Sequence, residues 1–399
     1  MLKNFNKKTL YLSYDGVLEP LGSSQVLNYV LGMSKISDFI LYTFEKISDL
    51  KDKKRVDEIE QQAKSCGVIW KKSIYHHKPT TVATIYDLII LSWNVLCMLI
   101  FQRIETIHLR GYLLGIPLLL FRNWFSFNLI FDMRGFWADE KADRAGWNKS
   151  GQKYKFFKRL EKKLLNKADK IITLTTNSKR ILVETHGVAS SKIEVIRTCA
   201  DEKLFIKQPK PYQKEIKFGY LGTLDTAYDF TKVLRFFKKF HSINQDCSLD
   251  VYSAKNKDYV DSVARKNGFE QIDKISVNFV RDKEKLVNAI NSFDVCIFYL
   301  NENYSVKASM PTKVGEVLMC GVPIICNKFN EDIEEIINLG CGMVCNFDND
   351  DMQKINQFLL QNKKSKEIQE NCRLVASQEF SLNTGLKLYT SIYKDLTYE

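Results

Sequence analysis

The sequence predicts an α/β protein with two doubly wound, Rossmann-like domains. Strand-like and helical stretches alternate through the first half, and a second alternating set begins at residue 216. The chain has 399 residues, which is enough for two or three domains that each bury a core of their own. Alternation of this kind is typical of parallel sheets with helices on both faces.

The elements follow from short apolar runs separated by amphipathic stretches. Strands are expected in the first half at residues 9–14, 39–44, 67–71, 106–109, 128–132 and 170–174, with helices at 24–34 and 51–66 among those between them. In the second half they are expected from 216 and at 248–252, 275–280, 295–299 and 323–326. The carboxyl ends of such strands are where ligands bind, so the loops that follow them carry the candidate residues.

A polar stretch with two prolines separates the two alternating sets and is the expected linker. The predicted division is residues 1–200 for the first domain, 201–214 for the linker and 215–378 for the second domain. Residues 379–399 contain an amphipathic helical pattern at 382–396, which we expect to pack back on the first domain.

Composition favours a globular cytoplasmic protein. Hydrophobic residues make up 45% and aromatic residues 12% of the chain, and the polar start is too short for a signal peptide. The ten cysteines show no paired CxxC spacing, so we expect reduced thiols and no metal site. No apolar run reaches the roughly 18–20 residues that span a bilayer, and the nearest, residues 88–101, is expected to be a buried helix.

Half of the net charge of +12 lies in one stretch, residues 153–170. Eight basic residues there face only Glu161 and Asp169, and apolar residues recur at helical spacing. A solvated helix face and a surface for anionic lipid headgroups both explain this pattern. Lipid binding would place the protein peripherally on the inner face of the plasma membrane. Nucleic acid is not an expected partner, because no recognisable nucleic-acid module accompanies the helix.

The segment 309–327 carries the strongest functional pattern. Pro311 opens a helix, Gly321 ends it, and an apolar strand follows. The amide groups at such a helix start attract anions, and Lys313 is expected to add a mobile positive charge there. Glu316 lies one turn beyond Thr312 and can accept hydrogen bonds from two ribose hydroxyls. The alternative is a surface helix in which Lys313 and Glu316 merely pair.

This segment resembles the donor-binding segment of the family 4 glycosyltransferases, which are retaining nucleotide-sugar transferases of the GT-B fold. The resemblance extends from about residue 9 to residue 396 and implies two domains facing each other across a cleft. We expect no divalent metal and no cofactor, because no DxD arrangement of aspartates follows a strand in the cleft. In that family the glutamate that holds the donor ribose matches Glu316. A second glutamate, eight residues earlier in many members, is replaced here by Ala308.

The loop after the first strand, residues 15–25, resembles the glycine-rich loop of these transferases. The resemblance implies that Gly22 lies against the donor phosphates and that Ser23, Ser24 and Gln25 bind the acceptor. An ordinary strand-to-helix turn in which Ser23 or Ser24 caps the helix is the alternative. No GxGxxG motif is present, which disfavours a dinucleotide-dependent dehydrogenase.

Two further loops of the first domain carry catalytic candidates. Many family members place a histidine near residue 108, but whether His108 or Arg110 faces the reacting sugar stays open at this stage. Residues 132–140 are similar to a motif of transferases that build bacterial surface polysaccharides. In that segment, Arg134 is predicted to neutralise a phosphate and Trp137 to stack on a sugar ring. Asp139 and Glu140 are predicted to bind acceptor hydroxyls, or one of them to act as a general base.

In the second domain, Gly222 and Thr223 match the family's loop that faces the donor diphosphate. Relatives often carry an arginine and a lysine there, but this loop has neither before Lys232. The positive charge that neutralises the leaving diphosphate must therefore come from other residues, with Lys313, Lys255 and Arg281 as candidates. Each of these can equally be a surface cation. The predicted donor contacts are Gly22, Gly222, Thr223, Lys255, Arg281, Ser309, Thr312, Lys313 and Glu316, and the predicted catalytic residues are Arg110, Arg134, Asp139 and Lys313.

The expected activity is metal-independent, retaining sugar transfer. UDP-sugars are the favoured donors, with GDP-sugars as the alternative, and the acceptor is a saccharide or a lipid-linked saccharide of surface polysaccharide synthesis. Two other classes stay open: a GT-B-fold sugar-nucleotide epimerase, which needs no acceptor, and a basic, non-catalytic binding module.

Overall fold

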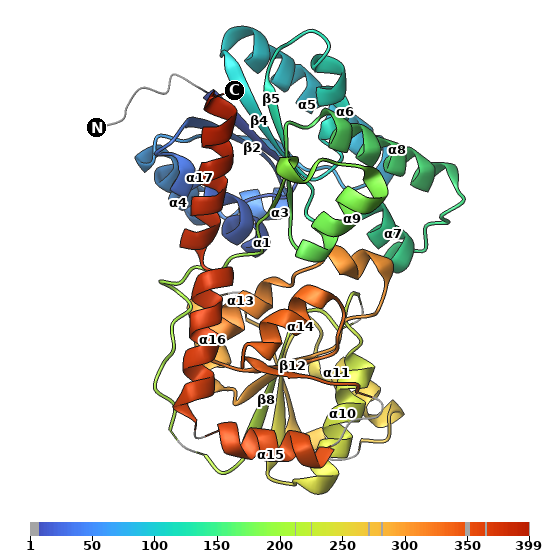
Figure 1. The fold of residues 1–399 in the computed structure, drawn as a ribbon, viewed down its shortest axis with the longest axis vertical. Coiled ribbons are helices and arrows are strands. Elements are labelled where there is room, and N and C mark those ends of the chain that lie inside the picture. Colours follow the sequence, from blue (N-terminus) through green and yellow to red (C-terminus); the bar gives the residue numbers. More distant parts are fainter. Residues whose placement is uncertain are drawn as a thin grey trace. The chain divides into compact units, whose positions relative to one another are not determined.

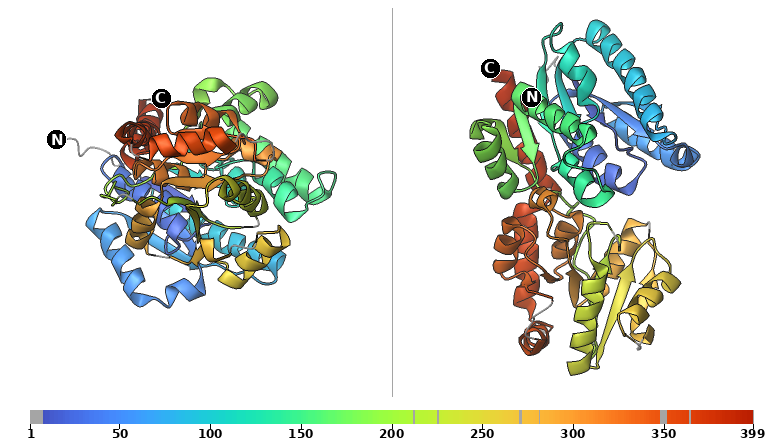
Figure 2. Two further views of the ribbon diagram at one scale, coloured as in Figure 1. Left: turned by 90° about the horizontal axis from the view of Figure 1, so that it is seen from below. Right: turned by 90° about the vertical axis from the view of Figure 1, so that its right-hand side faces the viewer.

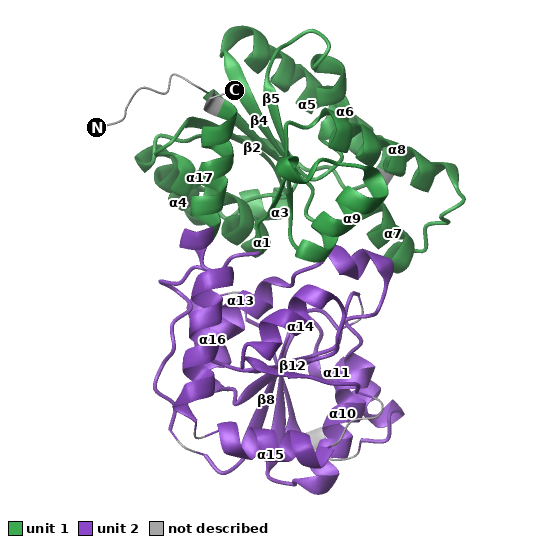
Figure 3. Ribbon diagram, in the orientation of Figure 1, with its two compact units in different colours: residues 1–197, 385–399 green, residues 198–384 purple. Residues whose placement is uncertain are grey.

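The computed structural model describes residues 8–211, 213–224, 226–269, 272–280, 282–347, 352–363 and 365–398. Two compact units make up the chain (Figure 3). Unit 1 comprises Met1–Arg197 and Gly385–Glu399, and unit 2 comprises Thr198–Thr384. The division therefore falls at Thr198, before the segment 201–214 in which the linker was expected, and the chain returns to unit 1 at its end.

Unit 1 contains a seven-stranded parallel sheet in the order β3-β2-β1-β4-β5-β6-β7 (Figure 1). All six strands predicted for this half are present, and β7 was missed because three residues are too short to show a pattern. The strands are β1 Lys8–Ser13, β2 Asp38–Glu45, β3 Ile69–Ile74, β4 Ile104–Arg110, β5 Asn128–Asp132, β6 Lys170–Thr173 and β7 Ile193–Val195.

Helices connect successive strands of unit 1 and cover the sheet. One helical segment contains α1 Pro20–Gly22, a π-turn at Ser23–Leu27 and α2 Asn28–Met33. The others are α3 Ile47–Leu50, α4 Lys53–Ser65, α5 Thr80–Phe101, α6 Gly115–Phe121, α7 Trp137–Ala145, α8 Gln152–Lys167, α9 Thr176–His186, a 3-10 turn at Ser190–Lys192, and α17 Leu382–Tyr398. The predicted terminal helix is thus present, and most of it lies in unit 1.

Unit 2 contains a six-stranded parallel sheet in the order β10-β9-β8-β11-β12-β13. Its strands are β8 Ile216–Leu221, β9 Cys247–Tyr252, β10 Ile275–Asn278, β11 Val295–Phe298, β12 Ile324–Cys326 and β13 Gly342–Val344. Its helical elements are α10 Phe230–Ile243, α11 Lys257–Lys266, α12 Lys283–Ser292, α13 Thr312–Met319, α14 Glu331–Asn338, α15 Met352–Asn362, α16 Lys366–Glu379, and 3-10 turns at Ile272–Lys274 and Tyr304–Ala308. The short β13 also escaped prediction.

The strand order reverses once in each sheet, between β1 and β4 and between β8 and β11. Crossovers on the two sides of such a point leave on opposite faces, which opens a crevice at the carboxyl ends of these strands. The loops after β1, β4, β8 and β11 are therefore the places to look for a binding site in each unit.

Helix α5 differs from its prediction as a buried helix. It is 22 residues long, and its residues Thr81–Phe101 are long and apolar enough to cross a membrane by length and composition. Only 28% of the most apolar 18-residue window of this stretch is buried inside the protein. Leu91, Val95 and Met98 on one side pack inward. The helix runs along the outside of the sheet of unit 1 (light blue, right-hand view of Figure 2), with its other side exposed.

A buried carboxylate holds the loop after β1. Glu45, at the end of β2, accepts hydrogen bonds from the backbone N–H groups of Val17 and Leu18 at 2.8 and 3.2 Å and from the Thr43 hydroxyl at 2.6 Å. Because burial outweighs these hydrogen bonds, the pKa of Glu45 is raised.

The helix after this loop begins at Pro20, with Glu19 as its N-cap residue. The expectation that Ser23 or Ser24 caps it was wrong, because proline is favoured at the first helical position and starts the helix earlier. Gly22 packs directly on the loop, and a Cβ atom at this position would lie 1.9 Å from the backbone oxygen of Gly16.

We predict that Gly22→Ala lowers the free energy of unfolding by about 2 kcal/mol or more, although alanine is the better helix former. The added carbon meets backbone, which cannot move aside. Gly32→Ala in α2 is the matched control, because its Cβ would meet only the end of the Leu386 side chain, at 2.5 Å. Urea unfolding measures both, and equal losses in the two variants would contradict the steric explanation.

Candidate active site

The centre of the carboxyl edge of unit 1 is the buried carboxylate of Asp132. Parallel register places Arg110, the last residue of β4, beside Asp132, the last residue of β5, and beside Ser13 of β1. The Arg110 guanidinium donates to Asp132 at 3.3 Å, and a guanidinium nitrogen of Arg134 lies 3.8 Å from the other carboxylate oxygen. From α17, the Tyr389 hydroxyl donates to Asp132 at 3.3 Å.

This cluster holds more positive than negative charge. Burial alone would raise the pKa of Asp132, but the positive charges of Arg134 and Arg110 lower it to about 2. Asp15 is 3.9 Å from Arg110 but its side chain is 62% exposed, so it screens little. Among the described residues, Arg110 Nε and one terminal nitrogen of Arg134 find no hydrogen-bond acceptor. Two guanidiniums with unused donors at strand ends suit an anionic ligand.

His108 is a core residue. It is fully buried, its ring stacks on Tyr11 at 4.2 Å between centroids, and its Nδ1 is 2.8 Å from the Tyr393 hydroxyl. Burial lowers its pKa, which Asp132 only partly opposes, so the ring is neutral at pH 7. Of the two residues left open by the sequence, Arg110 is the one at the strand end, and it is itself 6% exposed.

Arg134 adopts a left-handed backbone conformation, with φ of 58°. This conformation is uncommon for a residue with a side chain and concentrates at functional sites. The turn directs the guanidinium back toward Asp132 and within 3.5 Å of the Gln25 side-chain oxygen. Arg134 thereby joins the loop after β5 to the helical segment after β1.

Asp139 is buried and engaged with α8. Its carboxylate accepts from the Tyr154 hydroxyl at 2.6 Å and from the Lys158 ammonium at 2.9 Å, and Lys158 also pairs with the buried Glu161. These contacts anchor α7 to α8. The predicted roles of Asp139 as base or acceptor ligand require this pairing to break, whereas the anchoring role needs no change.

The other residues of this loop pack or lie at the surface. Trp137 belongs to an aromatic cluster, with its ring centroid 4.8 Å from Phe157, 5.5 Å from Trp147 and 6.2 Å from Tyr112. Glu140 pairs with Arg144 one turn later on the surface. Both are clear of the Arg110–Asp132–Arg134 contacts, and their acceptor roles stay predictions.

The three acceptor candidates after β1 have different surroundings. Gln25 is buried and contacts Arg134, which places it at the cluster. Ser23 is buried and accepts from Arg55 at 3.3 Å, whereas the Ser24 hydroxyl bonds the Leu21 carbonyl on the exposed side of the helix. Gly22 lies next to Gly16 as described above.

In unit 2, helix α13 begins at Thr312 with Pro311 as its N-cap residue, as the sequence predicts. The approach to the helix is fixed by Asn330, whose side-chain amide donates to the carbonyls of Val306 and Ser309 at 3.3 and 2.8 Å. Ala308 is fully buried in this approach. The Val314 N–H bonds the Pro311 carbonyl at 3.0 Å, so the N–H groups of Thr312 and Lys313 are the ones that the helix start leaves for an anion.

Lys313 is buried, and the expectation of a mobile surface charge was wrong. Its ammonium donates to the carbonyl of Leu221 and lies 3.7 Å from the centroid of the Tyr228 ring. Burial lowers its pKa to about 8, against smaller opposing effects of Cys296 and Glu316. The side chain turns inward because three aromatic rings, of Tyr220, Tyr228 and Phe298, form a cation-binding pocket at the end of β8.

This position brings Lys313 to the Gly222 loop. A Cβ atom on Gly222 would lie 3.3 Å from the Lys313 ammonium, and Gly222 has a φ of 117°, so the loop requires glycine there. Thr223 is exposed, with its hydroxyl 2.7 Å from that of Thr226. Gly222, Thr223 and Lys313, three predicted donor contacts, thus lie together.

Glu316 is partly exposed, one turn after Lys313. Burial raises its pKa to about 7, against the smaller effects of Lys283 and Lys313. No described residue forms a hydrogen bond or ion pair with the carboxylate, so the surface pair with Lys313 is not present. A carboxylate with free oxygens beside a helix start can accept two hydroxyl hydrogen bonds.

Two predicted donor contacts, Lys255 and Arg281, remain. Lys255 is exposed beyond β9, with its ammonium 4.6 Å from the centroid of the Tyr259 ring. Arg281 lies outside the described residues. Within those residues, no group of three or more His, Cys, Asp or Glu side chains is arranged to hold a metal ion.

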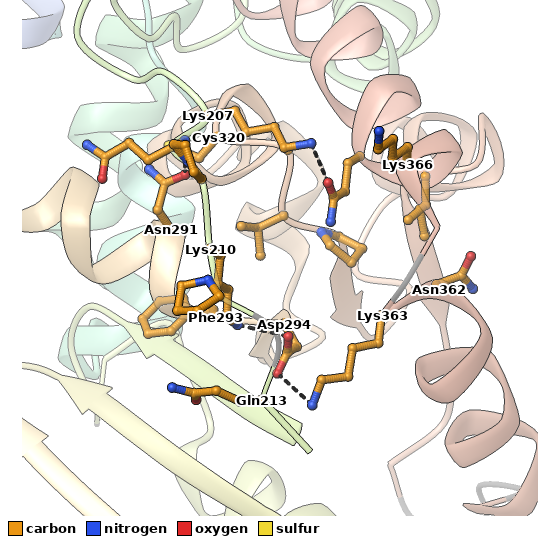
Figure 4. A pocket seen from close by; sticks show the side chains of 18 residues that line it. Lys207, Lys210, Gln213, Asn291, Phe293, Asp294, Cys320, Asn362, Lys363 and Lys366 are labelled. Carbon is orange, nitrogen blue, oxygen red and sulfur yellow. Dashed lines mark hydrogen bonds and ion pairs between the residues drawn. The ribbon is translucent and has the colours of Figure 1, made fainter. Parts of the chain in front are cut away.

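Unit 2 also contains two cavities. One of about 450 Å³ lies at the amino ends of β11 and β12 and is lined by Lys207, Lys210, Asp294 and Lys363 among others (Figure 4). Lys210 and Lys363 both pair with Asp294 there, at 2.8 and 3.6 Å. A second cavity, of about 480 Å³, lies at the carboxyl ends of β11, β12 and β13. Only the second is on the edge where doubly wound sheets bind ligands.

Sequence reasoning missed the partners that hold these side chains. Asp132 was noted only as part of a loop, and Glu45, Tyr389 and Tyr393 were not singled out at all. A charged residue at the end of an apolar strand is the one available signal, since Glu45, Arg110 and Asp132 all occupy that position. Nothing in the sequence indicates the tyrosines, because their partners are more than 250 residues away.

Two family models match the chain. The one described as "Glycosyl transferase 4-like domain" matches residues 62–199, and the one described as "Glycosyl transferases group 1" matches residues 201–375. Among curated proteins the chain has no match.

Several solved structures have the same fold. A glycosyltransferase from Rickettsia africae is 14% identical, with a TM-score of 0.70 and 98% of each chain covered. Anabaena HepE in complex with UDP is 12% identical, with a TM-score of 0.69, 98% of this chain and 100% of that chain. WaaG, a glycosyltransferase involved in lipopolysaccharide biosynthesis, is 10% identical, with a TM-score of 0.65, 96% of this chain and 99% of that chain.

We predict that Asp132→Asn lowers the free energy of unfolding at pH 7 by about 3 kcal/mol or more, because two buried guanidiniums lose their counter-charge. The folded-state pKa of Asp132 is lower than the unfolded one, so its contribution is present above pH 4 and is lost as the pH falls toward 2. The difference between wild type and variant must therefore narrow in acid. Asp395→Asn, which removes a half-exposed partner of Lys170, is the control and changes stability by less than about 1 kcal/mol. A difference between wild type and Asp132→Asn that does not depend on pH would contradict the charge explanation.

Proposed function

Since this chain belongs to the group 1 glycosyltransferases, of the GT-B fold, we propose that it moves a sugar from a UDP-sugar to a saccharide or lipid-linked saccharide with retention of configuration. Family membership favours transfer over the epimerase and the basic binding module. UDP is the proposed nucleotide because HepE has been solved with UDP and with UDP-glucose. Retention rests on the family resemblance alone.

The observation that carries the donor assignment is the group formed by Lys313, the Gly222 loop and the start of α13. In the proposed reaction the bond between the anomeric carbon and the diphosphate oxygen breaks, and negative charge grows on the diphosphate. The buried ammonium and the first N–H groups of α13 are preorganised to stabilise that charge. Because burial lowers the pKa of Lys313, an anion that replaces the Leu221 carbonyl as its partner would be bound strongly.

Glu316 is proposed to accept hydrogen bonds from the ribose hydroxyls one turn into α13. Its oxygens have no hydrogen-bond or ion-pair partner among the described residues. The pKa of Glu316 is raised because the nearby positive charges of Lys283 and Lys313 do not offset its burial. Two ribose hydroxyls supply the missing donors. Ala308, in place of the family's second glutamate, leaves the far hydroxyls of the sugar to other groups.

In unit 1, Arg110 and Arg134 are the proposed anion-binding pair. Their unused donors suit a phosphate, whether of the donor or of a lipid-linked acceptor. Gln25 lies at the same cluster and is the best placed of the predicted acceptor residues. A role in surface polysaccharide or lipopolysaccharide synthesis is proposed from the loop 132–140 and the likeness to WaaG. We further propose that the protein is cytoplasmic and that α8 attaches it to anionic lipid, because a lipid-linked acceptor would lie in the membrane.

We predict that UDP and UDP-sugars raise the melting temperature of the protein more than GDP, ADP or CMP and their sugars do. Glu316→Ala should remove this shift and the transfer activity while leaving the melting temperature of the free protein unchanged within a few degrees. Glu367→Ala, which removes an exposed glutamate of α16, is the matched control. Failure of every nucleotide to stabilise the protein would refute the donor assignment. Transfer is measured with acceptor present and in excess EDTA, which should not reduce it if the reaction needs no metal.

The pKa shifts predict a narrow pH optimum for kcat/KM. Glu316 must be ionised, which requires a pH above about 7, and Lys313 must be charged, which requires a pH below about 8. Activity therefore falls about tenfold per pH unit on each side. Glu316→Gln should flatten the acid limb only, because an amide oxygen still accepts hydrogen bonds but does not titrate. An unchanged acid limb in that variant would assign it to another group.

A further inference from the structure

The exposed side of α5 is the most unusual surface of unit 1. Seven large apolar side chains of this helix are each more than half exposed: Val82, Ile85, Tyr86, Ile89, Trp93, Ile100 and Phe101. Most of them recur at intervals of three or four residues and so lie along one side of the helix, opposite the side that packs on the sheet. Contiguous apolar surface of this kind marks a contact with another apolar phase.

This side of α5 offers no charge and little polarity. The only charged residue of the helix, Asp87, is buried on the inner side and accepts a hydrogen bond from the Tyr14 hydroxyl at 2.9 Å. The polar side chains of Ser92 and Asn94 bond backward to the carbonyls of Leu88 and Ile90, at 2.6 and 2.8 Å. Polar groups satisfied inside their own helix can leave water at small cost.

The neighbouring helices extend this surface. Helix α6 packs beside α5, and Leu120 and Trp124 at its end are 57% and 73% exposed. Helix α8 packs beside α6 and presents an exposed Phe156. Six exposed basic residues share that face of α8: Lys153, Lys155, Arg159, Lys162, Lys163 and Lys167. Its acidic residue Glu161 is buried. One layer of helices thus combines an apolar helix with a strongly basic one.

We propose that the exposed side of α5, together with α6 and the basic side of α8, lies on an anionic lipid bilayer. Apolar and tryptophan side chains enter the boundary of the acyl chains, and lysines beside them attract anionic headgroups. The helix lies in the surface and does not cross it, because Leu91, Val95 and Met98 on its inner side are fixed in the core of unit 1. A soluble acidic partner would match α8 but not the exposed side of α5, which carries no charge.

The inference extends the lipid attachment proposed for α8 to the apolar side of α5 and to α6, and its test needs neither donor nor acceptor, so its failure would leave the proposed sugar transfer untouched. The purified protein is sedimented with vesicles of phosphatidylcholine alone or of phosphatidylcholine mixed with phosphatidylglycerol. We expect binding to the mixed vesicles that weakens with salt. Ile89→Glu combined with Trp93→Glu should weaken it at least about tenfold, because two charges must enter the interface. Lys155→Glu combined with Lys163→Glu should weaken it and reduce its salt dependence.

The matched control is Leu374→Glu, which puts the same charge on a 57% exposed leucine of unit 2 and should leave vesicle binding unchanged. Melting temperatures establish that each variant is folded. Vesicles with brominated acyl chains should quench tryptophan fluorescence less in Trp93→Phe than in wild type. Absence of wild-type binding, or equal binding of the Ile89→Glu and Trp93→Glu double variant, overturns the proposal. Concentration-dependent dimers that this double variant abolishes would also overturn it and assign the surface to a second copy of the chain.

Discussion

The carboxyl edge of the sheet in unit 1 depends on one buried carboxylate, that of Asp132. It neutralises part of the charge of Arg110 and Arg134 and accepts a hydrogen bond from Tyr389. These partners come from β4, from the loop directly after β5 and from α17, so one side chain joins two neighbouring strand ends to a helix 257 residues further along the chain. Removal of the carboxylate would leave two guanidiniums facing each other in a medium where charge repulsion is poorly screened.

Unit 2 handles its buried charge in another way. Lys313 has no carboxylate partner among the described residues and is held by a carbonyl and by aromatic faces. Such partners stabilise the ammonium less than a carboxylate would, so burial lowers the pKa of Lys313. The carboxylate of Asp132, by contrast, has guanidinium partners that lower its pKa and keep it ionised. A charge that is incompletely compensated in the free protein is available to a ligand. The carboxylate of Asp139 is already paired with Tyr154 and Lys158 and is therefore less available to a ligand, although the sequence predicts a functional role for it as well.

The fold was predictable because its information is local. Apolar runs and helical periodicity located eleven of the thirteen strands in the described part of the chain; the two that were missed there, β7 and β13, have three residues each and are too short to show a pattern. The punctuation by Pro311 and Gly321 likewise placed α13 correctly. The site was less predictable because burial decides what a charged side chain does. The sequence does not show that the side chain of Lys313 turns inward or that Asp139 is paired with Tyr154 and Lys158. Nor does it show that Tyr393, 285 residues further along the chain, contacts His108.

The contribution of α17 to unit 1 has a consequence for how the protein is made. A ribosome delivers the strands of this unit first and unit 2 next, and the helix that carries Tyr389 and Tyr393 follows both. Until then the surfaces of His108 and Asp132 that these tyrosines cover stay open to water. Domains usually complete folding in the order of their synthesis. Here the amino-terminal unit must wait until α17 has been synthesised, so nascent chains that stop before α17 carry an unfinished unit 1 although unit 2 already has all of its described strands.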